Sequence, residues 1–185
     1  MALVINGSAN TITGLAAGGL PAGSLTLRTI DLPSGTSLQT VTSAFGTSTT
    51  NITSDTWADT GHSGTITTLK ANSKILVQLT GGGWHDSGNG ASTAFITFDR
   101  NFDGGTYAYA TGAADSAHGL MRMSGDGENW NIGPFSCSLL DAPAQAAGTV
   151  IIYRVVARKV NASGNTQYQA SDRGLPTLTL TEIAA

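Results

Sequence analysis

The stretch Gly148-Thr-Val-Ile-Ile-Tyr-Arg-Val-Val-Ala-Arg-Lys-Val160 decides the fold class of this chain. It is the longest nearly unbroken apolar run, and its β-branched residues fit a pleated surface better than a helix. Read with a period of two, one face is apolar throughout, so we expect it to face a core. The members of this face are Ile151, Tyr153, Val155 and Ala157.

The opposite face of the same run mixes apolar residues with Arg154 and Arg158. A strand at the surface of a simple hairpin would show a cleaner polar face. We therefore predict a central strand whose outer face is partly covered by a loop or by another subunit. Apolar runs of this kind are also compatible with a buried helix, which is the competing interpretation.

From about Ser37 onward, turn signals divide the chain into short stretches with strand character. Their regular spacing and the lack of helical periodicity predict an all-β sandwich or barrel. The expected strands are 37–45, 48–53, 55–61, 64–69, 74–80, 92–99, 106–111, 118–123, 134–140, 149–159 and 176–183. The segment from Asp141 to Gly148 is the best place for a helical turn, although Pro143 limits it.

Residues 1–36 have a different character from the β-rich residues 37–185. Short strands are expected at 2–6 and 11–14, and the Gly and Pro content after them resists both helix and central strand. Leucines nevertheless recur there, at Leu15, Leu20, Leu25 and Leu27. A flexible linker would be more polar, so we interpret residues 1–36 as a docking segment. The alternative is a poorly ordered N-terminal arm.

The composition narrows the class of protein. Charged residues make up 11% of the chain, well below the roughly 25% of an average soluble domain. The net charge of −3 without a basic run argues against a nucleic-acid partner. The single Cys137 cannot form an intrachain disulfide and is expected to be a buried small hydrophobe. No apolar run approaches the length of a membrane span, and the N-terminus does not have the pattern of a secretory signal peptide.

Several pieces of the sequence, taken in order, resemble a known family. Ser54-Asp-Thr-Trp-Ala-Asp-Thr-Gly61 is followed by Gly64-Thr-Ile-Thr-Thr-Leu69 and Ala71-Asn-Ser-Lys-Ile-Leu-Val77. Much later come Thr149-Val-Ile-Ile-Tyr-Arg-Val155 and the ending Leu178-Thr-Leu-Thr-Glu-Ile-Ala-Ala185. This order resembles the C-terminal domain of bacteriophage tail-fibre and virion-fibre proteins of the cyanophage and marine phage type. The stretch from Thr11 to Ser24 is similar to the linker that precedes that domain.

The resemblance implies a jelly-roll-like β-sandwich that assembles as a homotrimer, with loops at one end able to touch a host or a neighbour. It also implies a virion structural protein, assembled in the host cytoplasm and attached to tail or capsid proteins through residues 1–36. A capsid decoration or head-fibre protein without a host ligand is one alternative. A secreted carbohydrate-binding module and a polysaccharide depolymerase are two others.

Two Gly-rich stretches, which we expect to be loops, contain the best candidates for binding a host-surface glycan. Tryptophan can stack on the apolar face of a sugar ring, while Asn or Asp can bond its hydroxyl groups. The candidate residues are Trp84, His85, Asp86, Asn129, Trp130 and Asn131. The structural alternative is that each Trp packs against the end of the sandwich or against a neighbouring subunit.

The sequence contains no local signature of catalysis or of a metal site. Zinc-hydrolase and serine-hydrolase patterns do not occur, so we expect no enzyme activity and no cofactor. Asp99-Arg-Asn-Phe-Asp-Gly-Gly105 and Ser124-Gly-Asp-Gly-Glu-Asn129 faintly resemble calcium loops but do not fit the EF-hand spacing. Both are more simply explained as Gly-dependent turns. His62, in a Thr-Gly-His-Ser-Gly context, is expected to be solvated.

Overall fold

The computed structural model describes residues 4–6, 11–13, 32–46, 50–87, 92–110, 119–125, 131–160, 165–169 and 174–185. Only the backbone is described for 4–6, 11–13, 50, 82–87, 92, 124–125, 131–133, 165 and 169. The chain divides into two compact units, Met1–Leu32 and Pro33–Ala185. In the first unit, strands β1 (Val4–Asn6) and β2 (Thr11–Thr13) form an antiparallel pair. Leu15, Leu20, Leu25 and Leu27 lie outside the described residues.

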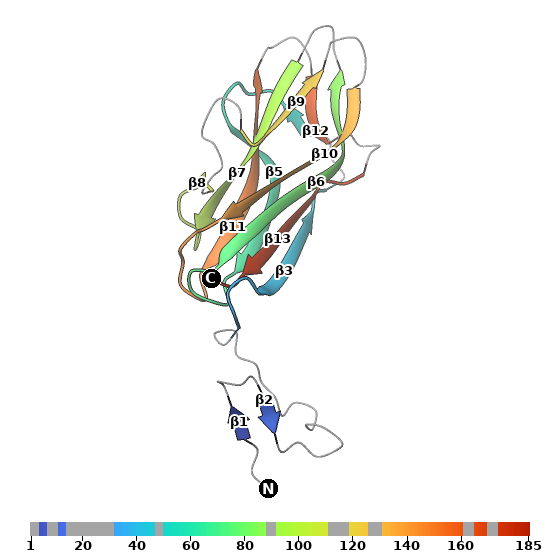
Figure 1. Cartoon of the computed structure of the whole chain (residues 1–185). Coiled ribbons are helices and arrows are strands. Elements are labelled where there is room, and N and C mark those ends of the chain that lie inside the picture. The colour runs from blue at the N-terminus through green and yellow to red at the C-terminus, as the bar shows by residue number, and fades with distance from the viewer. Residues whose placement is uncertain are drawn as a thin grey trace. The chain divides into compact units, whose positions relative to one another are not determined.

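The second unit is an all-β sandwich, as the sequence predicts (Figure 1). The described ranges contain no helix, and therefore none that is long and apolar enough to cross a bilayer. Its strands are β3 (Ser37–Ala44), β4 (Thr50–Ile52), β5 (Ala58–Thr67), β6 (Lys74–Ser87), β7 (Ser92–Phe102), β8 (Ala108–Tyr109), β9 (Met121–Gly125), β10 (Asn131–Asp141), β11 (Val150–Val160), β12 (Asn165–Gln169) and β13 (Thr177–Ile183).

One layer, which we call the β6 sheet, is built around the longest strand. Strand β10 pairs with one edge of β6, while β13 and then β12 pair with the other edge. Strands β3 and β4 complete this sheet beyond β13 and β12. The second layer, the β11 sheet, has the order β5-β11-β7-β8, with β9 also pairing with β7. All the pairings are antiparallel, and the successive long strands β5, β6, β7, β10, β11 and β13 alternate between the layers, which gives the jelly-roll-like arrangement.

The core lies between the two sheets. The β11 residues Ile151, Tyr153, Val155 and Ala157 are fully buried, which confirms the inward face predicted from the sequence. They meet Ile75, Val77 and Leu79 of β6 and Leu178 and Leu180 of β13 in one hydrophobic cluster. Cys137 packs against the same cluster in a partly buried position, and burial raises the pKa of its thiol to about 12.

One side of the sandwich is closed by side chains that cross between the sheets. The Gln39 Nε2 amide donates to the carbonyl of Thr67 at 2.6 Å, and the Ser43 hydroxyl donates to the carbonyl of Ser63 at 2.7 Å. The two carbonyls belong to β5 and are not used in its pairing with β11. Because they are already hydrogen-bonded, this edge strand is protected from pairing with another sheet. The buried carboxylate of Glu182 accepts hydrogen bonds from the amides of Leu69 and Lys70 and so fixes the turn that follows β5.

Four local expectations are corrected by the structure. The stretches 55–61 and 64–69 were expected to be two strands, but both contribute to the single strand β5. This strand continues through Gly61-His62-Ser63-Gly64, where its pairing with β11 contains a bulge. Strand β6 continues to Ser87 through the Gly-rich stretch that was expected to be a loop. Strand β12 was not predicted at all. The segment after Asp141 forms an irregular connection and no helical turn, which agrees with the presence of Pro143.

Candidate functional site

The two candidate glycan-binding stretches are brought together along the backbone. Trp84, His85 and Asp86 lie in β6 rather than in a loop, and Asn131 begins β10. The ladder places Asn131 opposite Asp86 and Gly133 opposite Trp84. Asn129 and Trp130 lie outside the described residues. The backbones of Trp84, His85, Asp86 and Asn131 therefore lie side by side, a neighbourhood that the sequence alone did not predict.

A site with described side chains lies elsewhere, on the outer face of the β11 sheet. It is a pocket of about 220 Å³, which we call the outer-face pocket. Its lining includes Trp57, Asp99, Tyr107, Tyr109, Arg154 and Val156. The register explains how β7 and β11 meet there, because Asp99 lies directly opposite Arg154 and such cross-strand neighbours point to the same face.

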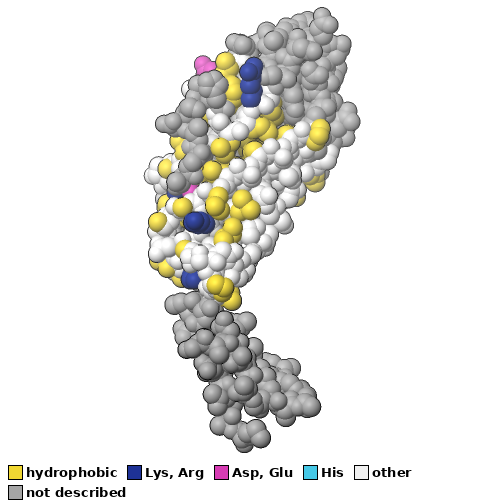
Figure 2. Space-filling model, in the orientation of Figure 1, with side chains coloured by type: hydrophobic (Ala, Val, Ile, Leu, Met, Phe, Trp, Pro, Cys, Tyr) yellow, Lys and Arg dark blue, Asp and Glu magenta, His cyan; other side chains and the backbone are white. Residues whose placement is uncertain are grey.

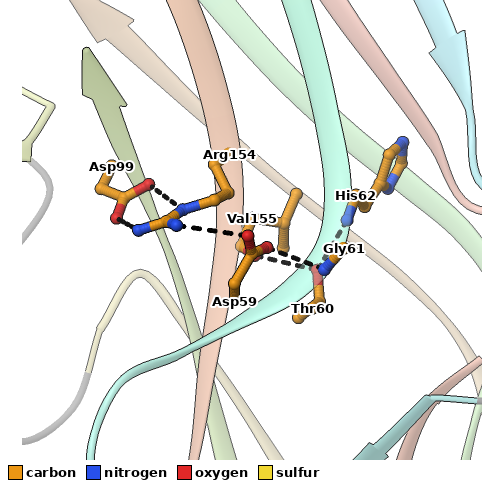
Figure 3. A network of polar contacts seen from close by, with 7 residues as sticks. All are labelled: Asp59, Thr60, Gly61, His62, Asp99, Arg154 and Val155. Atoms are coloured by element: carbon orange, nitrogen blue, oxygen red, sulfur yellow. Dashed lines mark hydrogen bonds and ion pairs between the residues drawn. The ribbon is translucent and has the colours of Figure 1, made fainter. Parts of the chain in front are cut away.

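Arg154 is the polar centre of this pocket, and Figure 3 shows its contacts with Asp99 and Asp59. Its Nε and Nη2 donate to the two carboxylate oxygens of Asp99 at 3.0 and 2.6 Å, while Nη1 donates to Asp59 at 3.2 Å. The bond to Asp99 is bidentate and charge-assisted, which makes it geometrically specific as well as strong. These contacts, with the hydrogen bond to Asp99 as the largest contribution, raise the pKa of Arg154 above its ordinary value. The guanidinium is therefore held as a fixed cation at the base of the pocket.

Aromatic rings form the walls of the pocket. The guanidinium carbon of Arg154 lies 3.7 Å from the centroid of the Tyr107 ring, a close cation–π contact. Trp57 and Tyr109 meet with their centroids 6.5 Å apart and their planes 73° from parallel, so the two rings make a corner. Tyr109 is 36% exposed. The pocket thus presents ring surface to solvent beside an organised polar group.

The turn after β7 places the tyrosines over the sheet. Asp103 and Gly104 both have positive φ, and the amide of Gly105 donates to the carbonyl of Phe102, which is the geometry of a tight hairpin turn. The chain then returns as β8, and Arg100 Nη1 donates to the carbonyl of Tyr109 at 2.8 Å. The stretch Asp99–Gly105 therefore ends in the Gly-dependent turn that the sequence suggested.

The indole of Trp57 packs closely against the backbone of Gly119. A Cβ atom added at Gly119 would lie 2.7 Å from Cη2 of Trp57 and 2.6 Å from the carbonyl oxygen of Ile96. Gly119 also has a φ of +58°, a conformation that favours glycine. The indole can approach this closely only because position 119 has no side chain.

His62 belongs to a separate buried network and is 1% exposed, so the expectation that it would be solvated is wrong. Its Nε2 lies 2.9 Å from the carbonyl of Ser43, and its Nδ1 lies 2.7 Å from the hydroxyl of Tyr168. Since the carbonyl can only accept, Nε2 carries the hydrogen and Nδ1 accepts from Tyr168. Burial lowers the pKa of His62, against a smaller opposing effect of the Ser43 carbonyl. The ring is a neutral structural link between β3, β5 and β12.

Metal-ligating side chains do not gather within the part of the chain whose structure is described, where no group of three His, Cys, Asp or Glu side chains could hold an ion. The carboxylates of Asp59 and Asp99 both bond Arg154. The outer-face pocket is suited to binding a ligand, because it offers hydrogen-bond donors and acceptors next to aromatic faces.

Sequence reasoning did not single out the outer-face pocket, although two signals for it exist. Tyr107 and Tyr109 are spaced by two, which places them on the same side of an extended segment. Arg154 interrupts an apolar run, which indicates that its position needs a charge partner. The partner itself could not be named, because the pairing of Asp99 with Arg154 depends on a register across 55 residues of sequence.

Comparison with protein-family models and with curated proteins finds no match for this chain.

Proposed function

We propose that this chain is a virion structural protein of a bacteriophage, a short trimeric fibre or fibre-like knob. In this proposal the segment 1–36 docks onto tail or capsid proteins, and the sandwich contacts a glycan on the host surface. The observation that carries the proposal is the division of the chain into a small N-terminal unit and a sandwich that contains its own core. Such a division suits a protein that is held at one end and presents the other.

The surface of the sandwich also supports a role in contact rather than in chemistry. Figure 2 shows a face made mostly of uncharged polar groups and backbone, with scattered hydrophobic side chains and few charges. Few charges mean little long-range attraction or repulsion, so contacts form through hydrogen bonds and apolar surface at short range.

The docking half of the proposal is tested by deleting residues 1–32 from the chain in an otherwise intact phage. The deletion should stop at residue 32, because Gly35 donates to the carbonyl of Ala184 and Ala184 donates to the carbonyl of Thr36. We expect the truncated protein, which lacks residues 1–32, to fold but to be absent from purified particles. A matched variant with Leu15, Leu20, Leu25 and Leu27 all changed to Ser tests whether the leucines carry the docking. Unchanged incorporation of the deleted protein into particles would contradict the proposal.

A secreted carbohydrate-binding module is the second candidate, and the outer-face pocket is the observation that favours it. Such a module would be a monomer and would bind sugar without any particle. A capsid decoration protein would show the opposite pattern, with a place on the head and no glycan ligand. Polysaccharide-cleavage assays address the depolymerase alternative, and we expect no cleavage.

A further inference from the structure

We infer that the outer-face pocket is a binding site for one uncharged sugar residue of a glycan. The inference rests on the proposed attachment function for its biological meaning, but its chemistry follows from the pocket alone. It assigns recognition to Trp57, Tyr109, Asp99 and Arg154, and not to the stretches around Trp84 and Trp130.

The size and walls of the pocket fit a single ring. Sites for drug-sized ligands begin at roughly 300 Å³, so a pocket of about 220 Å³ suits something smaller. Trp57 and Tyr109, which meet at 73°, offer one ring for stacking and the edge of a second ring against the side of the ligand. A pyranose has an apolar C–H face and a rim of hydroxyl groups, which matches such a corner.

The polar groups at the base have unused hydrogen-bonding capacity. A guanidinium has five N–H groups, and three of those of Arg154 donate to Asp99 and Asp59. Two N–H groups therefore remain for a ligand, beside carboxylate oxygens of Asp99 that can each accept a further bond. Donors next to acceptors are what a pair of neighbouring hydroxyl groups requires, because each hydroxyl both donates and accepts.

The charges of the pocket argue for an uncharged ligand. Asp99 and Arg154 are the charged residues of the lining, and their formal charges cancel. Arg154 is further neutralised by Asp59. An acidic sugar would have to compete with two carboxylates for one guanidinium and would also be repelled by Asp99. Binding of a neutral sugar should in turn depend little on salt.

The test uses the full chain labelled with ¹⁵N and titrated with the methyl glycosides of glucose, galactose and mannose. We expect at least one of them to shift the Arg154 Nε–H signal, which is identified by its loss in Arg154→Lys. Tyr109→Ala should weaken binding about tenfold, as expected for the loss of one aromatic contact, while Tyr109→Phe should keep it. Leu175→Ala, at a 44% exposed leucine outside the lining, is the matched control and should bind like the unaltered protein.

Three outcomes would overturn the inference. The first is that none of the three glycosides binds, and the second is that sialic or uronic acids bind in preference to them. The third is binding that survives Tyr109→Ala but is lost in Trp84→Ala, which would move the site and leave glycan attachment intact. Docking through residues 1–32 is tested separately, by the composition of purified particles. The docking proposal and the sugar-site inference can therefore fail independently.

Discussion

At the scale of single residues, His62 makes the stability of the fold depend on pH. The ring is neutral and buried, and its pKa is lowered relative to 6.5 by burial. In the unfolded chain the same ring takes up a proton as the pH falls through about 6.5, and this favours unfolding. The contribution of His62 is therefore fully present above pH 6.5 and is lost progressively as the pH falls toward the folded pKa.

We expect the free energy of unfolding to decrease below pH 6.5 by at most about 1.4 kcal/mol per pH unit from this residue. His62→Gln keeps an amide that can donate to Ser43 and an oxygen that can accept from Tyr168, but it does not titrate. Urea denaturation between pH 7.5 and pH 5 should show a steeper loss of stability in the unaltered protein than in His62→Gln. Parallel pH dependences in the two proteins would show that His62 is not the sensor.

At the scale of elements, the pairing of β6 with β10 depends on a missing side chain. A Cβ atom at Gly81 would overlap the ring of Phe135, which lies over this glycine from the neighbouring strand. Phe135 is buried against Tyr168, with the two centroids 5.7 Å apart. We expect Gly81→Ala to destabilise the protein by about 1–3 kcal/mol, because the ring must leave its place in the core.

Chemical denaturation measures this effect directly. Gly46→Ala is the matched control, since a Cβ there meets nothing within 4 Å, and its effect should stay within about 0.5 kcal/mol. Replacing Phe135 by Leu in the Gly81→Ala background should recover part of the loss. Equal stability of Gly81→Ala and Gly46→Ala would mean that β6 and β10 can shift without cost.

Elements with a strict alternation were predictable from the sequence, and those defined by long-range partners were not. The two faces of β11 could be assigned because apolar residues repeat with the period of a strand. Strand β12 and the far half of β6 are polar or Gly-rich, so their strand structure depends on long-range pairing: β12 pairs with β6 and β4, and the far half of β6 also pairs with β10. The outer-face pocket was missed for the same reason, because the approach of Trp57, Tyr109 and Arg154 depends on register and turn geometry.

At the scale of the whole molecule, residues of the same chain cover part of the outer face of β11, and this limits the surface that is left for contacts with other copies of the chain. The sequence left open whether that face meets a loop or another subunit. In the structure Tyr107 stacks on Arg154, and Arg158 lies 5.4 Å from the Trp57 ring, so residues of the same chain cover part of it. We therefore expect a contact between copies to use another surface. Among the large hydrophobic residues whose side chains are described, Leu140 is the most exposed, at 50%, and it lies on β10, which pairs with β6 alone among the described strands.

We therefore expect the full chain to form a trimer in which Leu140 is part of the contact between copies. Light scattering at micromolar concentration should give about three times the chain mass of 18.8 kDa. Leu140→Lys should shift this mass toward the monomer, because a buried unpaired charge destabilises an interface, while Leu175→Lys should leave it unchanged. A trimer that withstands Leu140→Lys would place the contact elsewhere. A stable monomer of the unaltered chain would instead contradict the fibre proposal and favour the carbohydrate-binding module.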